Sequence, residues 1–184
     1  PSTKDILQAV EAVPSDKIII LPNNKNIVPT PQQVESLTDK SIEVVPTESV
    51  PQGAAALLAF DYEADFETNA KLMTEAKSGV KTIEITRATR STKLNGLAIK
   101  KKQAIGLLDG NLLAVNDEPD DVLSELLARI DLDKAEVITI YHGDDTDEAE
   151  AERVSAAIRQ QHPNLQVEVV RGGQPHYNYI VSIE

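Results

Sequence analysis

Four consecutive large aliphatic residues, Ile18 to Leu21, interrupt an otherwise polar stretch of the chain. A strand with one face in water alternates apolar and polar residues, whereas an unbroken apolar run is typical of a strand buried on both faces. Ile42 to Val45 forms a second short strand pattern, and helical patterns precede, separate and follow the two. Short buried strands joined by helices predict a parallel sheet covered by helices on both faces.

A polar, proline-containing segment follows each of these predicted strands: Pro22 to Asn26 after the first and Pro46 to Gly53 after the second. Right-handed crossovers place both segments at the carboxyl ends of the strands, where α/β sheets bind ligands and partners. We therefore select as candidate binding residues Asn23, Asn24, Asn26, Thr47, Ser49, Gln52 and Gly53. A local role stays open, because asparagine is common in turns and the second group can cap the helix that begins near Pro51.

The periodicity changes at about residue 80. Val80 to Arg87 alternates, and the Asn95-Gly96 and Asp109-Gly110 pairs are strong signals for two-residue hairpin turns, so we expect an antiparallel meander from about 80 to 115. Helical patterns beginning at Pro119 and Asp145 then alternate with strand patterns. This arrangement predicts an α/β sandwich with a mixed sheet.

The predicted fold class is therefore α/β, with a parallel α/β/α part at residues 1–79 and a mixed-sheet α/β sandwich at residues 80–184. The sequence leaves open whether these are two subdomains or one intertwined unit. The chain opens at Pro1 without an initiator Met and soon enters a helical pattern that starts at Lys4, so we interpret the chain as a piece of a longer protein.

The amino-acid composition limits which kinds of partner this chain can bind and where in the cell it is expected. With 18 basic and 30 acidic residues the net charge is −12, which repels phosphate backbones and anionic membranes and argues against a nucleic-acid partner. The absence of cysteine excludes disulfides and thiolate zinc sites and fits a reducing cytoplasm. No apolar run approaches the ~20 residues of a membrane span, and no signal peptide is visible. We expect a cytoplasmic protein without membrane insertion.

The common catalytic signatures are absent: there is no Walker loop, dinucleotide fingerprint, Gly-x-Ser-x-Gly elbow or His-Glu-x-x-His motif. The acidic residues from Asp144 to Glu148 open a predicted helix, where carboxylates are favoured electrostatically, so no metal site is predicted. His142 and His176 lie at expected loop positions, where imidazoles act as acid, base or donor, or simply bond to backbone. The remaining candidate binding residues are His142, Gly172, Gly173, Gln174 and His176. No catalytic residue is assigned.

Lys100-Lys101-Lys102 is a short basic run within the predicted meander. Lysines commonly protect the exposed edge of a sheet against pairing with another chain, which is the interpretation we prefer. Contact with an anionic partner is the alternative.

Four segments, in order along nearly the whole chain, resemble one known family: residues 18–26, 44–53, 138–143 and 172–180. They resemble the C-terminal region of the A subunit of bacterial fatty acid kinase, which is a dihydroxyacetone-kinase-like (YloV-type) protein. The resemblance implies a fold related to DegV-type fatty-acid-binding proteins and to the dihydroxyacetone-binding kinase subunit. It further implies that ATP and Mg²⁺ bind to the parent protein's N-terminal domain and that a separate DegV-like B subunit holds the fatty acid. No cofactor is expected in this chain, which lacks the clustered-aspartate nucleotide loop.

The resemblance leads to the hypothesis that this chain is a non-catalytic domain that docks the fatty-acid-binding B subunit, so that the acyl carboxylate is phosphorylated elsewhere in a kinase serving phospholipid metabolism. The alternative is a domain that binds a small molecule or fatty acid itself. A stand-alone enzyme using His142 or His176 is a third class, and a homodimer is a further assembly that the sequence leaves open.

Overall fold

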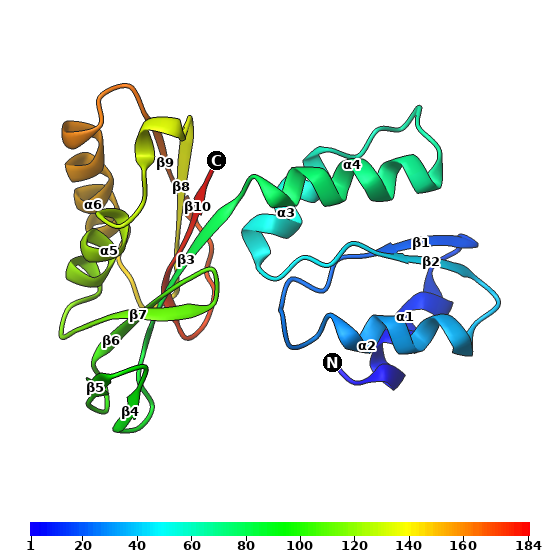
Figure 1. Cartoon of the computed structure of the whole chain (residues 1–184), viewed down its shortest axis with the longest axis horizontal. Helices are drawn as coiled ribbons and strands as arrows, with labels where there is room; N and C mark the ends of the chain where they lie inside the picture. The colour runs from blue at the N-terminus through cyan, green and yellow to red at the C-terminus, as the bar shows by residue number, and fades with distance from the viewer. The chain divides into compact units, whose positions relative to one another are not determined.

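The computed structural model describes all residues, 1–184, and divides into two compact units, Pro1–Val80 and Lys81–Glu184 (Figure 1). Each unit has its own sheet and its own apolar clusters. None of the helices is long and apolar enough to cross a membrane.

The first unit is an α/β/α arrangement around two parallel strands. Its elements are α1 (Thr3–Ala12), β1 (Lys17–Ile20), α2 (Pro29–Val34), η1 (Glu35–Leu37), β2 (Ser41–Val44), α3 (Val50–Leu58) and α4 (Phe66–Ser78). In the parallel register Ile18 lies opposite Ile42, and Ile20 lies opposite Val44. Ser2 and Asp5 form a capping box at the start of α1, so the first helix begins where its sequence satisfies the free backbone N–H groups.

Helices cover both faces of this small sheet (Figure 1). The apolar cluster on the α1 and α2 side contains Val10, Ile18, Val34 and Ile42. The cluster on the α3 and α4 side contains Val45, Ala56 and Met73, with Ile19 and Leu21 packed against them. Successive strand residues thus serve opposite cores, which is the physical reason that the run from Ile18 to Leu21 does not alternate.

The second unit is built on a six-stranded mixed sheet. Its elements are β3 (Lys81–Arg87), β4 (Thr92–Leu94), β5 (Leu97–Ile99), β6 (Ala104–Leu108), β7 (Asn111–Asn116), α5 (Pro119–Leu127), η2 (Leu132–Lys134), β8 (Val137–His142), α6 (Glu148–Gln161), β9 (Gln166–Arg171) and β10 (Tyr177–Ile183). The strand order is β7-β6-β3-β10-β8-β9, with β8 and β9 parallel and the other neighbours antiparallel. The predicted α/β fold with a mixed sheet is confirmed.

The main core of the second unit lies between this sheet and the helices α5 and α6, which cover one face (Figure 1). Ile83, Ile85, Ile138 and Val181 are fully buried there, together with Leu123 and Leu126 from α5. Because aliphatic side chains fill this layer, the low aromatic content of 3% does not prevent a large core.

The predicted meander is only partly continuous. Strand β3 pairs directly with β6, and β4 and β5 form a separate two-stranded sheet (Figure 1). Two backbone hydrogen bonds join the ends of the segment that carries β4 and β5. The Ala88 N–H donates to Gln103 O at 2.9 Å, and the Lys102 N–H donates to Ala88 O at 2.8 Å. A local apolar cluster that includes Ala88, Ile99 and Leu112 holds this hairpin against the larger sheet.

Candidate functional site

The two polar segments of the first unit meet where β1 and β2 end. Thr47 Oγ1 donates a hydrogen bond to Asn23 Oδ1 at 2.8 Å and accepts one from the Asn23 backbone N–H at 3.0 Å. Thr47 is 0% exposed, and Asn23 adopts a left-handed backbone conformation with φ of 55°. Parallel pairing brings both strand ends to one edge, so residues 24 positions apart satisfy each other's polar groups.

The start of α3 holds this pair in place. Ser49 is the N-cap of the helix, and its Oγ accepts a hydrogen bond from the Gln52 N–H at 3.4 Å. Gln52 Oε1 in turn accepts one from the Glu48 N–H at 2.8 Å. Gly53 packs directly on Asn23, because a Cβ at position 53 would lie 2.1 Å from Asn23 Oδ1. These residues therefore have the local capping and packing roles that their sequence allowed.

The solvent side of this edge carries the exposed residues Asn24, Lys25, Asn26 and Glu48. Asn24 Oδ1 accepts a hydrogen bond from the Asn26 N–H at 2.9 Å, which closes a local asparagine turn. We refer to residues 23–26 together with Thr47 and Glu48 as the strand-end rim. On its inner side Thr47 and Asn23 hydrogen-bond to each other, and the side chains of residues 24–26 and Glu48 on its outer side are exposed.

In the second unit, four predicted site residues form one hydrogen-bonded loop at the end of β8. The carbonyl of His142 accepts hydrogen bonds from the Gly172 and Gly173 N–H groups at 3.0 and 3.1 Å. Gln174 Nε2 donates to Tyr141 O at 2.9 Å. His142 is buried, and its Nδ1 lies 3.0 Å from Thr146 O, a carbonyl that can only accept, so Nδ1 carries the proton. The structure thus gives His142 a backbone-bonding role.

His176, two residues after Gln174, takes no part in these hydrogen bonds. It is exposed, its φ is 72°, and its backbone carbonyl accepts a hydrogen bond from Thr86 Oγ1. It lines a polar cavity of about 790 Å³ that also has Arg87, Asp120 and Tyr179 in its wall.

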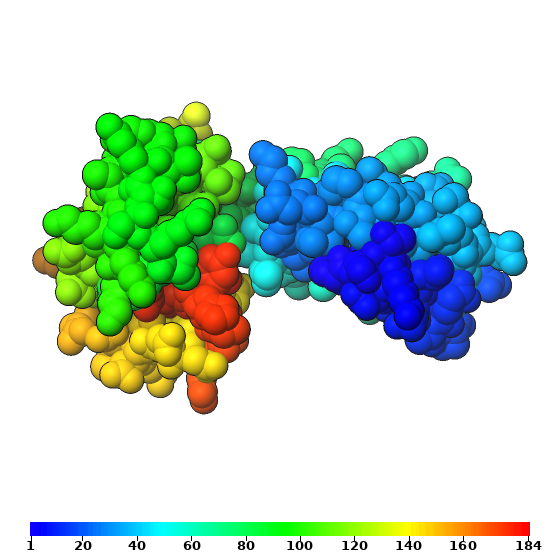
Figure 2. Space-filling model, turned by 90° about the horizontal axis from the view of Figure 1, so that it is seen from below, coloured from blue at the N-terminus to red at the C-terminus, as the bar shows by residue number.

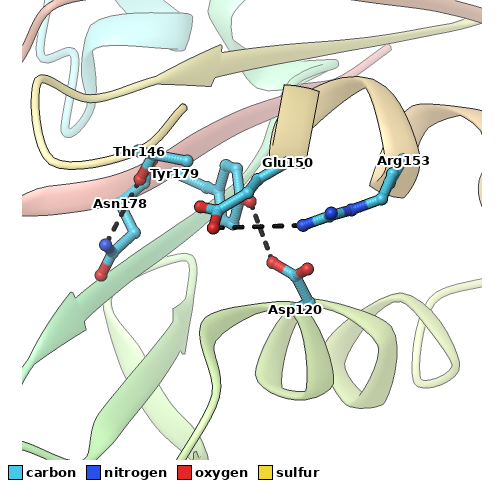
Figure 3. A network of polar contacts seen from close by, with 6 residues as sticks. All are labelled: Asp120, Thr146, Glu150, Arg153, Asn178 and Tyr179. Carbon is cyan, nitrogen blue, oxygen red and sulfur yellow. Dashed lines mark hydrogen bonds and ion pairs between the residues drawn. The ribbon is translucent and has the colours of Figure 1, made fainter. Parts of the chain in front are cut away.

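A network of polar contacts forms part of this cavity wall (Figure 3). Tyr179 Oη, from the centre of β10, donates to Asp120 Oδ1 in the first turn of α5 at 2.9 Å. Thr146 Oγ1 and Asn178 exchange hydrogen bonds of 3.2 and 3.3 Å. On α6 an oxygen of Glu150 lies 4.0 Å from Arg153 Nη2. Three elements of the second unit therefore converge on one polar surface.

Burial, reinforced by the hydrogen bond to Asp120, strongly raises the pKa of the Tyr179 phenol. The phenol consequently stays neutral at physiological pH and acts as a donor. Asp120 and Glu150 already have partners in Tyr179 and Arg153, and no group of three or more His, Asp or Glu residues is placed to hold a metal ion.

Sequence reasoning did not select the residues of this network. Asn178 and Tyr179 lie just beyond the loop that was selected, but no spacing rule relates them to Asp120, which is 59 positions from Tyr179. A buried tyrosine inside a strand pattern is more commonly a core residue, so only the tertiary contacts distinguish it.

Comparison with known sequences decides the family. Residues 1–184, the whole chain, match the family of C-terminal domains of proteins like the A subunit of fatty acid kinase. This chain belongs to that family. The chain is also 37% identical over all of its 184 residues to an uncharacterised protein of Staphylococcus aureus strain MRSA252, and 36% identical to one of strain USA300. It spans 34% of the length of each of these curated relatives.

Several solved structures share the fold of this chain at low sequence identity. The B3 protein of the Streptococcus pneumoniae fatty acid kinase, loaded with linoleic acid, matches all of the chain and 76% of its own, with a TM-score of 0.67 and 14% identity. A DegV family protein of Corynebacterium glutamicum gives 0.68 at 13% identity, with 82% of its chain covered. Dihydroxyacetone kinase from C. freundii, in complex with AMP-PNP and Mg²⁺, gives 0.64 at 12% identity, with 42% covered. The DegV and dihydroxyacetone kinase relationship of the fold is thereby confirmed.

Proposed function

We propose that this chain is the docking domain of the A subunit of a fatty acid kinase. In this proposal it binds a DegV-like B subunit that carries a fatty acid, and another part of the longer protein phosphorylates the acyl carboxylate. Membership of the A-subunit-like family supports the kinase context. The strand-end rim is the surface that we assign to the partner.

The observation that carries the proposal is the mutual pairing of Thr47 and Asn23. A carboxylate ligand at the end of a strand needs hydroxyl and amide donors that are free to bind it. Here the Thr47 hydroxyl donates to the Asn23 side chain, and the Asn23 backbone N–H donates to Thr47. A rim whose buried hydroxyl and neighbouring backbone N–H are already paired with each other's residue, and whose outer side chains are exposed, suits a protein surface better than it suits a fatty-acid headgroup.

The chemistry of phosphoryl transfer belongs, in this proposal, to the remainder of the longer protein. Such transfer needs carboxylates that hold Mg²⁺ and donors that hold the phosphates, and the carboxylates of this chain form no such group. ATP and Mg²⁺ would therefore bind outside these 184 residues. The chain's own contribution is to position a partner.

One feature favours the alternative function, a domain that binds a fatty acid itself. An apolar pocket of about 350 Å³ in the first unit is lined by residues that include Ile19, Leu21, Phe60, Phe66 and Met73. A ligand in this pocket would stabilise the folded chain according to its concentration and affinity. Thermal unfolding with and without a series of free fatty acids separates the two functions, because a docking domain shows no concentration-dependent shift.

Isothermal titration of the chain with a fatty-acid-loaded B-type DegV-like protein tests the docking function directly. The double variant Lys25→Glu/Asn26→Asp changes two exposed rim side chains, and we expect it to weaken binding by about tenfold or more. The matched variant Lys4→Glu/Gln8→Asp makes the same change in charge on the exposed face of α1. It should bind within about twofold of the unmodified chain, as expected for surface changes outside an interface.

Two results would contradict the proposal. No measurable heat or complex at micromolar concentrations of both proteins would remove the docking function. Equal affinity of the rim variant and the α1 variant would place the interface elsewhere on the chain.

A further inference from the structure

Positive charge is concentrated in one short segment of this acidic protein. Residues 87–102 contain six of the 18 basic residues of the chain and no aspartate or glutamate. This segment, which we call the basic hairpin, includes β4, β5 and the turns that flank them. Its basic residues are Arg87, Arg90, Lys93, Lys100, Lys101 and Lys102. A surface that serves only solubility mixes both signs of charge, so a cluster of one sign indicates a more specific role for this segment.

None of these six side chains is neutralised by a carboxylate. All six are exposed, and the ion pairs of the chain involve Arg129, Lys134, Arg153 and Arg159 instead. Asp117 lies beside the base of the hairpin, but its carboxylate accepts a hydrogen bond from Gln103 Nε2 at 2.8 Å, and Arg87 Nη1 donates to its backbone carbonyl at 3.1 Å. Arg87 also shares the wall of the 790 Å³ cavity with the carboxylates of Asp120 and Asp121, so the positive charge without a nearby acid lies on the other five residues, from Arg90 to Lys102.

Hydrogen bonds hold the lysine turn in one conformation. The Lys100 N–H donates to Gln103 Oε1 at 2.9 Å, and the Lys101 N–H donates to Ser91 Oγ at 2.9 Å. Lys102 has a φ of 75°, a conformation that costs energy for a residue with a side chain. A turn that only needed to reverse the chain would place glycine or asparagine there at lower cost. The structure thus presents three consecutive lysines on a preorganised turn.

The tip of the hairpin adds an apolar element. Leu94 is 53% exposed beside the Asn95-Gly96 turn, whereas Ile99 on the opposite strand is buried and anchors the hairpin. Figure 2 shows this green part of the chain on the surface of the second unit. An exposed aliphatic side chain on a lysine-rich element combines the two attractions that bring peripheral proteins to lipid, namely apolar contact and charge.

From these observations we propose that the basic hairpin binds the anionic headgroups of a lipid bilayer, without insertion of the chain into the membrane. The net charge of −12 opposes this contact at long range, but at physiological salt the field is screened beyond about 8 Å, so the charges nearest the surface dominate. A nucleic-acid strand fits less well, because residues 87–102 contain no aromatic side chain on which bases could stack.

Vesicle co-sedimentation with the full chain tests the proposal and needs no partner protein, so its result is independent of the docking function. We expect binding to phosphatidylcholine vesicles that contain about 30% phosphatidylglycerol, and little binding to pure phosphatidylcholine. Binding should fall steeply when salt is raised from about 50 to about 500 mM, because the Debye length shortens.

The variant Lys100→Gln/Lys101→Gln removes two charges and keeps Lys102 with its unusual backbone. We expect it to lower the partition coefficient on anionic vesicles by about tenfold. The control Lys4→Gln/Lys71→Gln removes the same charge from exposed helical positions of the first unit and should leave binding unchanged. Circular dichroism of each variant shows whether it is folded.

Leu94→Ser tests the apolar contribution and should weaken binding by about threefold while the dependence on salt is preserved. Equal binding to neutral and anionic vesicles would overturn the proposal, as would unchanged binding of the Lys100→Gln/Lys101→Gln variant. Absence of vesicle binding together with retention on immobilised polyglutamate would also overturn it and would assign the hairpin to an acidic protein.

Discussion

Tyr179 Oη donates a hydrogen bond of 2.9 Å to Asp120 Oδ1 and so ties the buried middle of β10 to the first turn of α5. Tyr179 is 1% exposed, whereas Asp120 lies in the wall of an open polar cavity. The contact links two elements that also share the apolar core of the second unit, and it holds the start of α5 against the sheet. It also keeps an ionisable phenol in its neutral form.

Replacement of Tyr179 by Phe should lower the free energy of unfolding by about 1–2 kcal/mol, because a hydrogen bond to a charged acceptor is lost while the ring packing remains. Urea denaturation followed by circular dichroism measures the change. Tyr62→Phe is the control, since Tyr62 is 91% exposed, and it should change stability by less than about 0.5 kcal/mol. Equal effects of the two variants would show that the Asp120 contact contributes nothing.

We expect the Thr47 hydroxyl to make a sizeable contribution to the free energy of unfolding. Thr47→Val keeps the shape of a fully buried side chain but leaves the Asn23 N–H and Oδ1 without their partner, at a cost of about 1–3 kcal/mol. Thr92→Val, at an exposed position of β4, is the matched substitution and should be nearly neutral. Chemical denaturation of both variants checks the prediction, and a neutral Thr47→Val would mean that water replaces the hydroxyl.

Replacing each of two helix-associated glycines by alanine should have different effects on the stability of the folded chain. At Gly53 the new Cβ would lie 2.1 Å from Asn23 Oδ1, so the Asn23 side chain must leave Thr47, and we expect a loss of about 1–2 kcal/mol. At Gly79 the nearest atom is Ala76 O at 3.6 Å, which is ordinary contact, so Gly79→Ala should be neutral or slightly stabilising. Thermal unfolding of the pair measures the difference, and an equal response would contradict the packing of Gly53 on Asn23.

Glu84 on β3 provides a prediction with a defined dependence on pH. Burial raises the pKa of the Glu84 carboxyl above its usual value of 4.5. The folded state therefore keeps the proton at a pH where the unfolded chain has released it, and stability falls as the pH rises from about 4.5 through the raised pKa. Glu84→Gln should remove this loss, so its gain in melting temperature over the unmodified chain should be larger at pH 7 than at pH 4.

The exposed residue Glu136 supplies the control for this experiment. Glu136→Gln makes the same chemical change in the second unit, and its effect on the melting temperature should be similar at both pH values. A difference between pH 4 and pH 7 that is the same for both variants would show that the burial of Glu84 has no influence on stability.

Much of the first unit could be predicted from local patterns. The unbroken run from Ile18 to Leu21 indicated a strand covered on both faces, and the parallel pair with helices on each side confirms it. The predicted helix start near Pro51 is also observed, with Ser49 as the N-cap of α3. Such features depend on residues that are close in sequence, which is why periodicity and capping rules detect them.

The sequence by itself thus determined the types of element, the α/β class and the polar character of the loops at the strand ends. The tertiary structure alone decided that Thr47 and Asn23 satisfy each other, that β4 and β5 leave the main sheet, and that Tyr179 meets Asp120. The physical reason is that helix and strand patterns arise from neighbours within a few residues, whereas a polar group's partner is set by geometry across the fold. The hydrogen bonds between Thr47 and Asn23 and between Tyr179 and Asp120 join residues 24 and 59 positions apart, and no periodic pattern in the sequence indicates them.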